Sequence, residues 1–213
     1  PTLDDRWAAI APRAEPALAG REVIVDPAEV VALRQDLTVR VDVLDVRSEA
    51  EFNLFHLAAA RRVTLDDARD PVFVKRLIDV PDNTLVFLMS NDEGAATAVW
   101  RLLKAQGVLN LYVVAGGINA WLDRHPPSPC VARRAGHGGA PDVLAWEFAL
   151  AVGDRIASAH PERPGADPAL PCPGAEAAST PLAAVGHGHG ATAPAYVPKV
   201  KLQKKKVAKG GCG

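Results

Sequence analysis

The chain has 213 residues, and its 24 Lys and Arg against 25 Asp and Glu give a formal net charge of -1. This balance argues against nucleic acid as a partner, although an anionic membrane surface stays open for the basic end of the chain. Apolar residues make up 48% of the sequence, which suffices for the core of one ordinary domain. No stretch approaches the roughly 20 consecutive apolar residues of a membrane-spanning helix. We therefore expect a soluble chain, either cytoplasmic or membrane-associated through a segment that precedes Pro1.

The three cysteines, Cys130, Cys172 and Cys212, lie far apart in Pro-rich or Gly-rich surroundings. An odd number of cysteines without metal-ligand spacing argues against a disulfide framework or a zinc site. No cofactor-binding motif stands out, so neither a cofactor nor a structural metal is expected. Aromatic residues almost vanish after Phe148, which places the expected core in the first three quarters of the chain.

Short apolar runs alternate with helical patterns through the first 124 residues. Asp26 and Pro27 supply an N-cap and a first-turn proline for one helix, and Ser48 with Glu51 forms a capping box for another. The expected elements are, in chain order, strand 22–25, helix 28–34, strand 39–46, a helix from Ser48, strand 61–65, helix 73–78, strand 85–89, a helix from Ala95 and strand 111–114.

This alternation predicts an α/β fold with about five mainly parallel strands and helices on both faces of the sheet. In such sheets ligands sit beyond the carboxyl ends of the strands. The loops after Val46 and Met89 lie at that edge. The second loop runs directly from a strand into a helix, so its backbone N–H groups converge as in an anion site.

The chain divides into five parts, and no chemistry is assigned to the first of them. The predicted organisation is a lead-in over 1–22, irregular or briefly helical, a compact domain over 23–124, a Pro-rich and Gly-rich linker over 125–141, an amphipathic helix over 142–160, and a tail over 161–213. The tail is too poor in large apolar residues to order by itself and ends in a basic block.

Several local patterns occur in one order. Leu44–Arg47 is followed by Glu51–Phe52 and by His56, and later come Leu102–Gly107 and the Gly-Gly…Trp pattern of Val113–Trp121. With these patterns, residues 41–121 resemble the rhodanese homology domain, the fold of thiosulfate and persulfide sulfurtransferases. The resemblance implies a catalytic cysteine at the start of the loop after the fourth strand.

That position holds Ser90, and no cysteine occurs between Pro1 and Pro129. Persulfide chemistry needs a thiolate, because a serine hydroxyl neither ionises comparably nor holds a second sulfur atom. The rest of the loop, Asn91, Asp92, Glu93, Gly94 and Ala95, adds two carboxylates where an anionic substrate would bind. We therefore expect a sulfurtransferase fold without sulfurtransferase activity.

Individual residues of the domain allow two interpretations each. Ser90 is either an activated nucleophile or a cap of the following helix, and the absence of a G-x-S-x-G elbow favours the cap. Asp92 with Glu93 either binds a cation or basic partner or forms a solvated acidic turn. Arg47 is either a substrate clamp or the partner of Asp45 in a structural ion pair, which we favour.

The tail offers further candidates. His187 and His189 can hold a metal only weakly without further ligands. The lysine block with Lys204, Lys205 and Lys206 either contacts an acidic protein, anionic lipid or nucleic acid, or only solubilises the tail. Cys212, on a Gly-rich tip near lysines, is either a persulfide or metal carrier or an incidental thiol.

The expected function is that of a catalytically inactive interaction or scaffold module, an accessory subunit of a larger assembly. The 142–160 helix and the basic tail would contact the partner protein. The alternative is sulfur relay, with Cys212 as the persulfide carrier.

Overall fold

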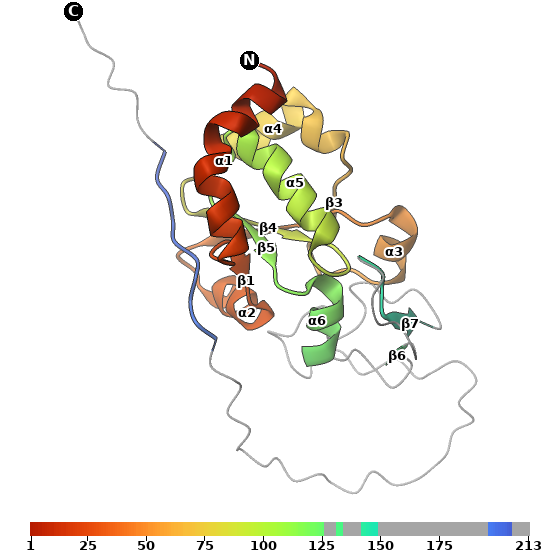
Figure 1. The fold of residues 1–213 in the computed structure, drawn as a ribbon. Helices are drawn as coiled ribbons and strands as arrows, with labels where there is room; N and C mark the ends of the chain where they lie inside the picture. Colours follow the sequence, from red (N-terminus) through yellow and green to blue (C-terminus); the bar gives the residue numbers. More distant parts are fainter. Residues whose placement is uncertain (126–130, 134–141, 149–195, 206–213) are drawn as a thin grey trace, which may run out of the picture.

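The computed structural model describes residues 1–125, 131–133, 142–148 and 196–205. Five parallel strands form a sheet in the order β1-β5-β4-β2-β3, and helices cover both of its faces (Figure 1). The strands are β1 (Ile24–Val25), β2 (Arg40–Asp45), β3 (Arg61–Arg62), β4 (Thr84–Met89) and β5 (Leu111–Val114). The helices are α1 (Leu3–Ala19), α2 (Pro27–Gln35), α3 (Glu49–Leu54), α4 (Pro71–Asp79), α5 (Gly94–Ala105) and α6 (Gly117–Arg124), with a short 3-10 turn η1 (Asp67–Arg69). The predicted α/β fold is confirmed.

The central strand β4 is continuously apolar because both of its faces are buried. Leu85, Phe87 and Met89 point into the core on one face of the sheet, whereas Val86 and Leu88 point into the core on the other face. All five side chains are fully buried. A strand that helices cover on both sides needs apolar residues at every position, because neither set faces water.

Each face of the sheet has its own set of helices. The first core joins α2, α3 and α6 around Phe55 and Trp121, and the second joins α1, α4 and α5 around Trp100. The capping box predicted at Ser48 and Glu51 is present at the start of α3. The N-cap predicted at Asp26 is also confirmed, because its carboxylate accepts a hydrogen bond from the first turn of α2.

The prediction of an irregular or briefly helical lead-in was wrong. Leu3–Ala19 is a helix of 17 residues that continues through Pro12 and Pro16. Its apolar face packs on α5, where the rings of Trp7 and Trp100 meet edge to face with centroids 6.5 Å apart. Tertiary packing of an amphipathic face supplies most of the stability of a helix in a protein, and here it outweighs the two prolines.

The helix predicted over 142–160 was wrong in its first part. Trp146–Phe148 forms strand β7, which pairs antiparallel with β6 (Val131–Arg133), a segment predicted as linker. Leu144, Ala145 and Trp146 are buried, so the apolar pattern marks a buried segment of extended chain rather than a helix face. Residues 149–160 lie outside the part of the chain that the structure describes.

The basic end of the chain was predicted as part of a disordered tail, but residues 196–205 lie in extended form along the domain (Figure 1). The buried carboxylate of Glu29 accepts the backbone N–H groups of Lys199 and Val200 at 2.9 Å each. Tyr112 exchanges two hydrogen bonds with the backbone of Lys201 through its hydroxyl, at 2.8 and 3.0 Å. Polar groups of the folded domain therefore hold this segment.

Candidate functional site

The loop between β4 and α5 lies at the carboxyl end of the sheet. It begins with Ser90 and Asn91, which are 0% and 3% exposed. The neighbouring loop after β2 joins it there, since the N–H of Val46 donates to the carbonyl of Met89 at 2.9 Å. The two loops that were predicted to meet at this edge do so.

Ser90 caps the helix that follows it. Its buried Oγ accepts a hydrogen bond from the N–H of Ala96 at 3.2 Å, as the favoured interpretation predicts. The histidine inside the predicted domain, His56, stacks on Phe52 with centroids 4.0 Å apart, and its Nδ1 lies 2.8 Å from the carbonyl oxygen of Phe52. Ser90 therefore serves as a cap of α5.

The backbone N–H groups of the loop converge on a carboxylate of the same chain. Asp142 Oδ1 accepts the N–H groups of Asn91 and Asp92 at 2.8 and 3.1 Å, and its Oδ2 accepts the N–H of Ala95. In return, the N–H of Asp142 donates to Asp92 Oδ2 at 2.6 Å. The anion site expected from the strand–loop–helix geometry is thus present, and the side chain of Asp142 fills it.

Asp92 belongs to the internal hydrogen bonding of the loop. Its Oδ1 accepts the N–H groups of Glu93 and Gly94, the latter at 2.6 Å. Burial raises the pKa of Asp92, but the hydrogen bonds from Gly94, Asp142 and Glu93 together lower it more, so the pKa lies below its ordinary value. Asp92 is therefore a structural carboxylate rather than a solvated one.

Glu93 links the loop to two other parts of the fold. Its carboxylate accepts both terminal nitrogens of Arg21 at 2.8 and 3.0 Å and the N–H of Gly116 at 2.8 Å. Neither interpretation of the acidic turn describes these two residues well, because both carboxylates are held by groups of the chain itself. A search of the described residues finds no cluster of three or more His, Cys, Asp or Glu that could hold a metal.

Arg47 forms the predicted ion pair. Its Nη2 lies 2.6 Å from Asp45 Oδ2 and also donates to the carbonyl of Phe55 at 2.6 Å, and both side chains of the pair are 1% exposed. A buried bidentate pair of this kind fixes the end of β2 against the loop before α3. Nη1 of Arg47 is buried and has no hydrogen-bond partner among the described residues.

The segment that carries Asp142 also covers the loop. Asn119 clamps it with two hydrogen bonds, from its Nδ2 to the carbonyl of Val143 at 2.9 Å and from the N–H of Ala145 to its Oδ1 at 2.8 Å. Asn91 adds a third contact, because its Nδ2 donates to the carbonyl of Asp142 at 2.8 Å. Sequence reasoning missed Asp142, since nothing local marks a carboxylate that binds a loop 50 residues earlier.

The Gly-Gly pair at the start of α6 exists because the loop backbone passes directly against it. A Cβ on Gly117 would lie 2.3 Å from the carbonyl oxygens of both Ser90 and Asp92, and φ at this residue is +55°. The N–H groups of Ile118 and Asn119 donate to the carbonyls of Ser90 and Asn91 at 2.9 and 3.0 Å. Only glycine allows this close approach.

The predicted tail candidates are not brought to the loop. Lys204 is exposed, and Lys205 donates its amine to the carbonyl of Val80 and lies 3.9 Å from Asp82. Lys206, Cys212 and the pair His187 and His189 lie outside the residues that the structure describes.

Several solved structures are similar to part of this chain. A rhodanese-related protein from Thermoplasma volcanium is 19% identical over 57% of this chain and 97% of its own, with a TM-score of 0.39. A single-domain sulfurtransferase from Saccharomyces cerevisiae is 17% identical over 47% of this chain and 89% of its own, with a TM-score of 0.39. A Bacillus halodurans protein is 15% identical over 63% of this chain and 91% of its own, with a TM-score of 0.43.

A search of curated proteins gave no match. The family model described as "Rhodanese-like domain" matches residues 26–124, which include every strand of the sheet except β1 and every helix from α2 to α6. This chain therefore contains a rhodanese-like domain over residues 26–124.

Proposed function

We propose that this rhodanese-like domain is not a sulfurtransferase and that the chain serves as a protein-interaction or accessory subunit of a larger assembly. The observation that carries the proposal is the state of the β4–α5 loop. Ser90 stands where the resemblance implies a nucleophilic cysteine, and its buried hydroxyl is engaged by the helix that follows. A hydroxyl at this position cannot carry a transferable sulfur atom.

The electrostatics of the loop support the same proposal. The backbone donors that would stabilise an anionic substrate are engaged by the Asp142 carboxylate. Thiosulfate or a persulfide anion would have to displace that carboxylate and then lie beside Asp92. The negative charge of Asp92 would repel either anion. The buried segment Leu144–Trp146 packs next to this edge of the sheet and further limits access to it.

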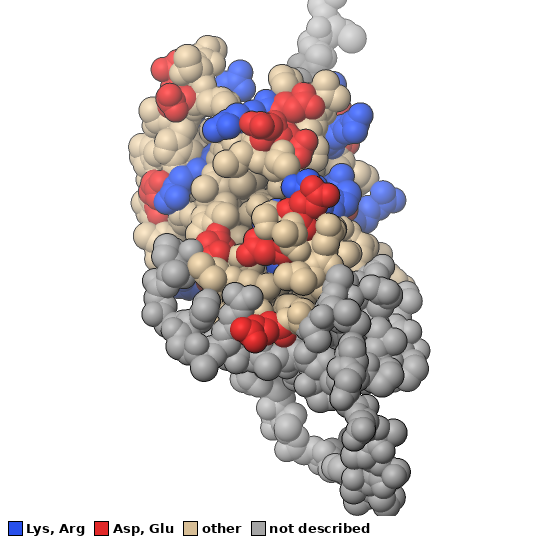
Figure 2. Space-filling model, turned by 90° about the vertical axis from the view of Figure 1, so that its right-hand side faces the viewer, with Lys and Arg blue, Asp and Glu red and all other residues tan. Residues whose placement is uncertain are grey.

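An interaction role agrees with the distribution of charge. Figure 2 shows acidic and basic side chains interleaved over the face that it presents, without a large field of one sign. This face gives no reason to expect nucleic acid, whose phosphates attract a continuous basic patch. In this proposal the partner is a protein, and exposed Lys204 on the docked C-terminal segment remains available to it.

A thiosulfate:cyanide sulfurtransferase assay tests the catalytic half of the proposal. The full chain and a Cys212→Ser variant are compared with an active rhodanese under the same conditions. We expect no turnover above background from either form. Turnover that the Cys212→Ser change abolishes would favour sulfur relay, and turnover that survives it would reveal catalysis elsewhere in the chain; both results would overturn the proposal.

A test of the proposed interaction role requires the native assembly. We expect chemical cross-linking and mass spectrometry of material purified from its source to connect this chain to a second protein. The accessory role fails if the natively purified chain is monomeric in sedimentation and forms only internal cross-links.

A further inference from the structure

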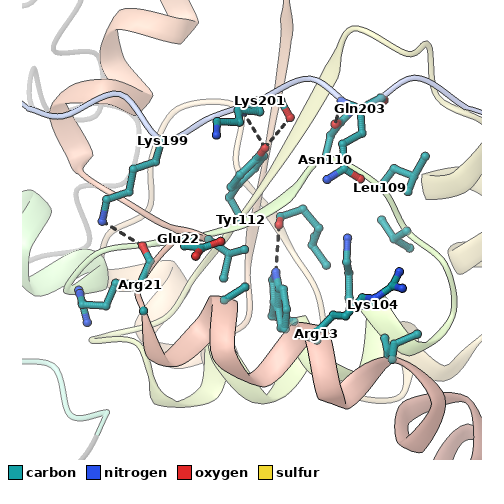
Figure 3. A pocket seen from close by; sticks show the side chains of 18 of the residues that line it. Arg13, Arg21, Glu22, Lys104, Leu109, Asn110, Tyr112, Lys199, Lys201 and Gln203 are labelled. Atoms are coloured by element: carbon teal, nitrogen blue, oxygen red, sulfur yellow. Dashed lines mark hydrogen bonds between the residues drawn. The ribbon is translucent and has the colours of Figure 1, made fainter.

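A large cavity lies beside the start of β5, away from the β4–α5 loop. Its volume is about 1010 Å³, and α1, the end of α5, residues 107–112 and the C-terminal segment form its walls. None of the residues of the loop from Ser90 to Ala95 lines it. Figure 3 shows the C-terminal segment crossing one side of the cavity while α1 and α5 form the other. The volume matches that of sites for small organic ligands.

Much of the wall is apolar. Ile10 and Ala14 come from α1, Trp100 from α5, and Val108 from the turn that follows α5. The indole N–H of Trp100 already donates to the carbonyl of Leu111 at 2.9 Å and its ring is buried, so the apolar surface open to a ligand comes from the partly exposed wall residues Ile10, Val23 and Leu109. The walls therefore favour a ligand with an apolar body.

The charged groups on the wall are mostly basic. Five cations, Arg13, Arg21, Lys104, Lys199 and Lys201, line the cavity with one carboxylate, that of Glu22. Two of the cations are used by the protein itself, because Arg21 pairs with Glu93 and the amine of Lys199 donates to two backbone carbonyls. Charge complementarity therefore points to an anion.

Lys104 marks the place of the anionic group. Its side chain is half-buried at the end of α5, and its amine has no hydrogen bond or ion pair within the described part of the chain. Burial lowers the pKa of this amine, which indicates a desolvated cation without compensation. Arg13 lines the same cavity and likewise has no partner among the described residues.

The neutral polar groups are largely committed elsewhere. Asn110 exchanges hydrogen bonds with the backbone of Gln203 at 2.7 and 3.2 Å, and the hydroxyl of Tyr112 is engaged by the backbone of Lys201. A sugar or nucleotide needs several free donors and acceptors, and this wall supplies few. What remains is apolar surface with cations at one end.

We propose that this cavity binds a small carboxylate with an apolar body, the carboxylate on Lys104 and Arg13 and the body against Ile10, Val23 and Leu109. Octanoate is a suitable probe, and octan-1-ol is its neutral match with the same chain. Titration calorimetry of the full chain should show saturable binding of octanoate with one site per chain. Octanol should bind about tenfold more weakly or worse, because it leaves the half-buried amine unpaired.

Lys104→Met tests the assigned contact, since it keeps the aliphatic stem and removes the charge. It should weaken octanoate binding about tenfold or more and leave octanol binding unchanged. The matched control is Lys75→Met on α4, where the lysine is exposed and pairs with Asp79, and its octanoate affinity should equal that of the wild type. Arg13→Met, at an exposed position, gives a second test that does not depend on how Lys104→Met folds.

Equal affinity for octanoate and octanol would overturn the proposal, as would no saturable binding of octanoate. Unchanged octanoate affinity in both Lys104→Met and Arg13→Met would also overturn it. These outcomes are independent of the sulfurtransferase assay, because the cavity shares no residue with the β4–α5 loop.

Discussion

Removal of the Asp142 carboxylate should open the β4–α5 loop. Asp142 accepts backbone N–H groups from Asn91, Asp92 and Ala95, and the first two lie at 2.8 and 3.1 Å. A hydrogen bond to a charged group contributes about 1.5–3 kcal/mol. Asp142 is only half-buried, so water replaces part of the loss, and we expect Asp142→Ala to weaken closure of the loop by about 3 kcal/mol.

Amide hydrogen exchange is the direct measurement of this effect. Because about 1.4 kcal/mol corresponds to a tenfold change, exchange at Asn91, Asp92 and Ala95 should accelerate on the order of 100-fold in Asp142→Ala. Asp142→Asn should give an intermediate rate, since the amide keeps one oxygen acceptor. Amides in the middle of β4 should be much less affected, because their ladder hydrogen bonds do not involve this segment.

Asp66→Ala is the matched control for removal of a carboxylate. The Asp66 side chain is 96% exposed and lies 3.5 Å from Arg69 in a surface ion pair. Such pairs contribute little, so the loop amides should exchange as in the wild type. Unchanged exchange in the loop of Asp142→Ala, or equal acceleration in Asp66→Ala, would contradict this role of the Asp142 carboxylate.

Four further changes test other contacts. Gly117→Ala should lower the free energy of urea unfolding by about 2 kcal/mol or more, because a Cβ would clash with the loop carbonyls at 2.3 Å; an unchanged midpoint would contradict this. Ser90→Cys should stay inactive with thiosulfate and cyanide, since Asp142 still occupies the loop amides; rescue to the rate of an active rhodanese would contradict it. The folded pKa of Asp92 lies below the ordinary value of an aspartate, so its stabilisation is present above about pH 4 and is lost as pH falls through the folded pKa. Asp92→Asn should therefore flatten the acid limb of a stability–pH profile, and an unaltered limb would argue against it. Glu29→Gln should speed proteolysis of the C-terminal segment, whose N–H groups the carboxylate holds at 2.9 Å; equal cleavage rates would exclude this role.

Much of the domain follows from local patterns in the sequence. The uninterrupted apolar run of β4 predicts a strand covered on both faces, and its five consecutive residues from Leu85 to Met89 are fully buried in two separate cores. Capping at Ser48 and Asp26 locates the starts of two helices within a residue. These signals are readable because a strand, a helix or a cap depends on residues a few positions apart.

The sequence also determines that Ser90 opens the loop and that no thiol is available in the domain. It does not reveal what fills the loop. That depends on Asp142, which reaches the amides of Asn91 and Asp92 from 51 and 50 positions along the chain. A carboxylate that satisfies distant backbone donors leaves no periodicity of its own.

The two ends of the chain show the same limit. The prolines predicted an irregular or briefly helical start, but packing of Trp7 against Trp100 accompanies a long helix. Low complexity predicted a disordered end, but Glu29 and Tyr112 hold its backbone against the domain. Local sequence patterns determined the sheet, the helix caps and the presence of a serine at position 90. Contacts between distant segments decided that Asp142 fills the loop, that the first helix is long and that the C-terminal segment docks. Such contacts form only when the folded chain brings distant residues together.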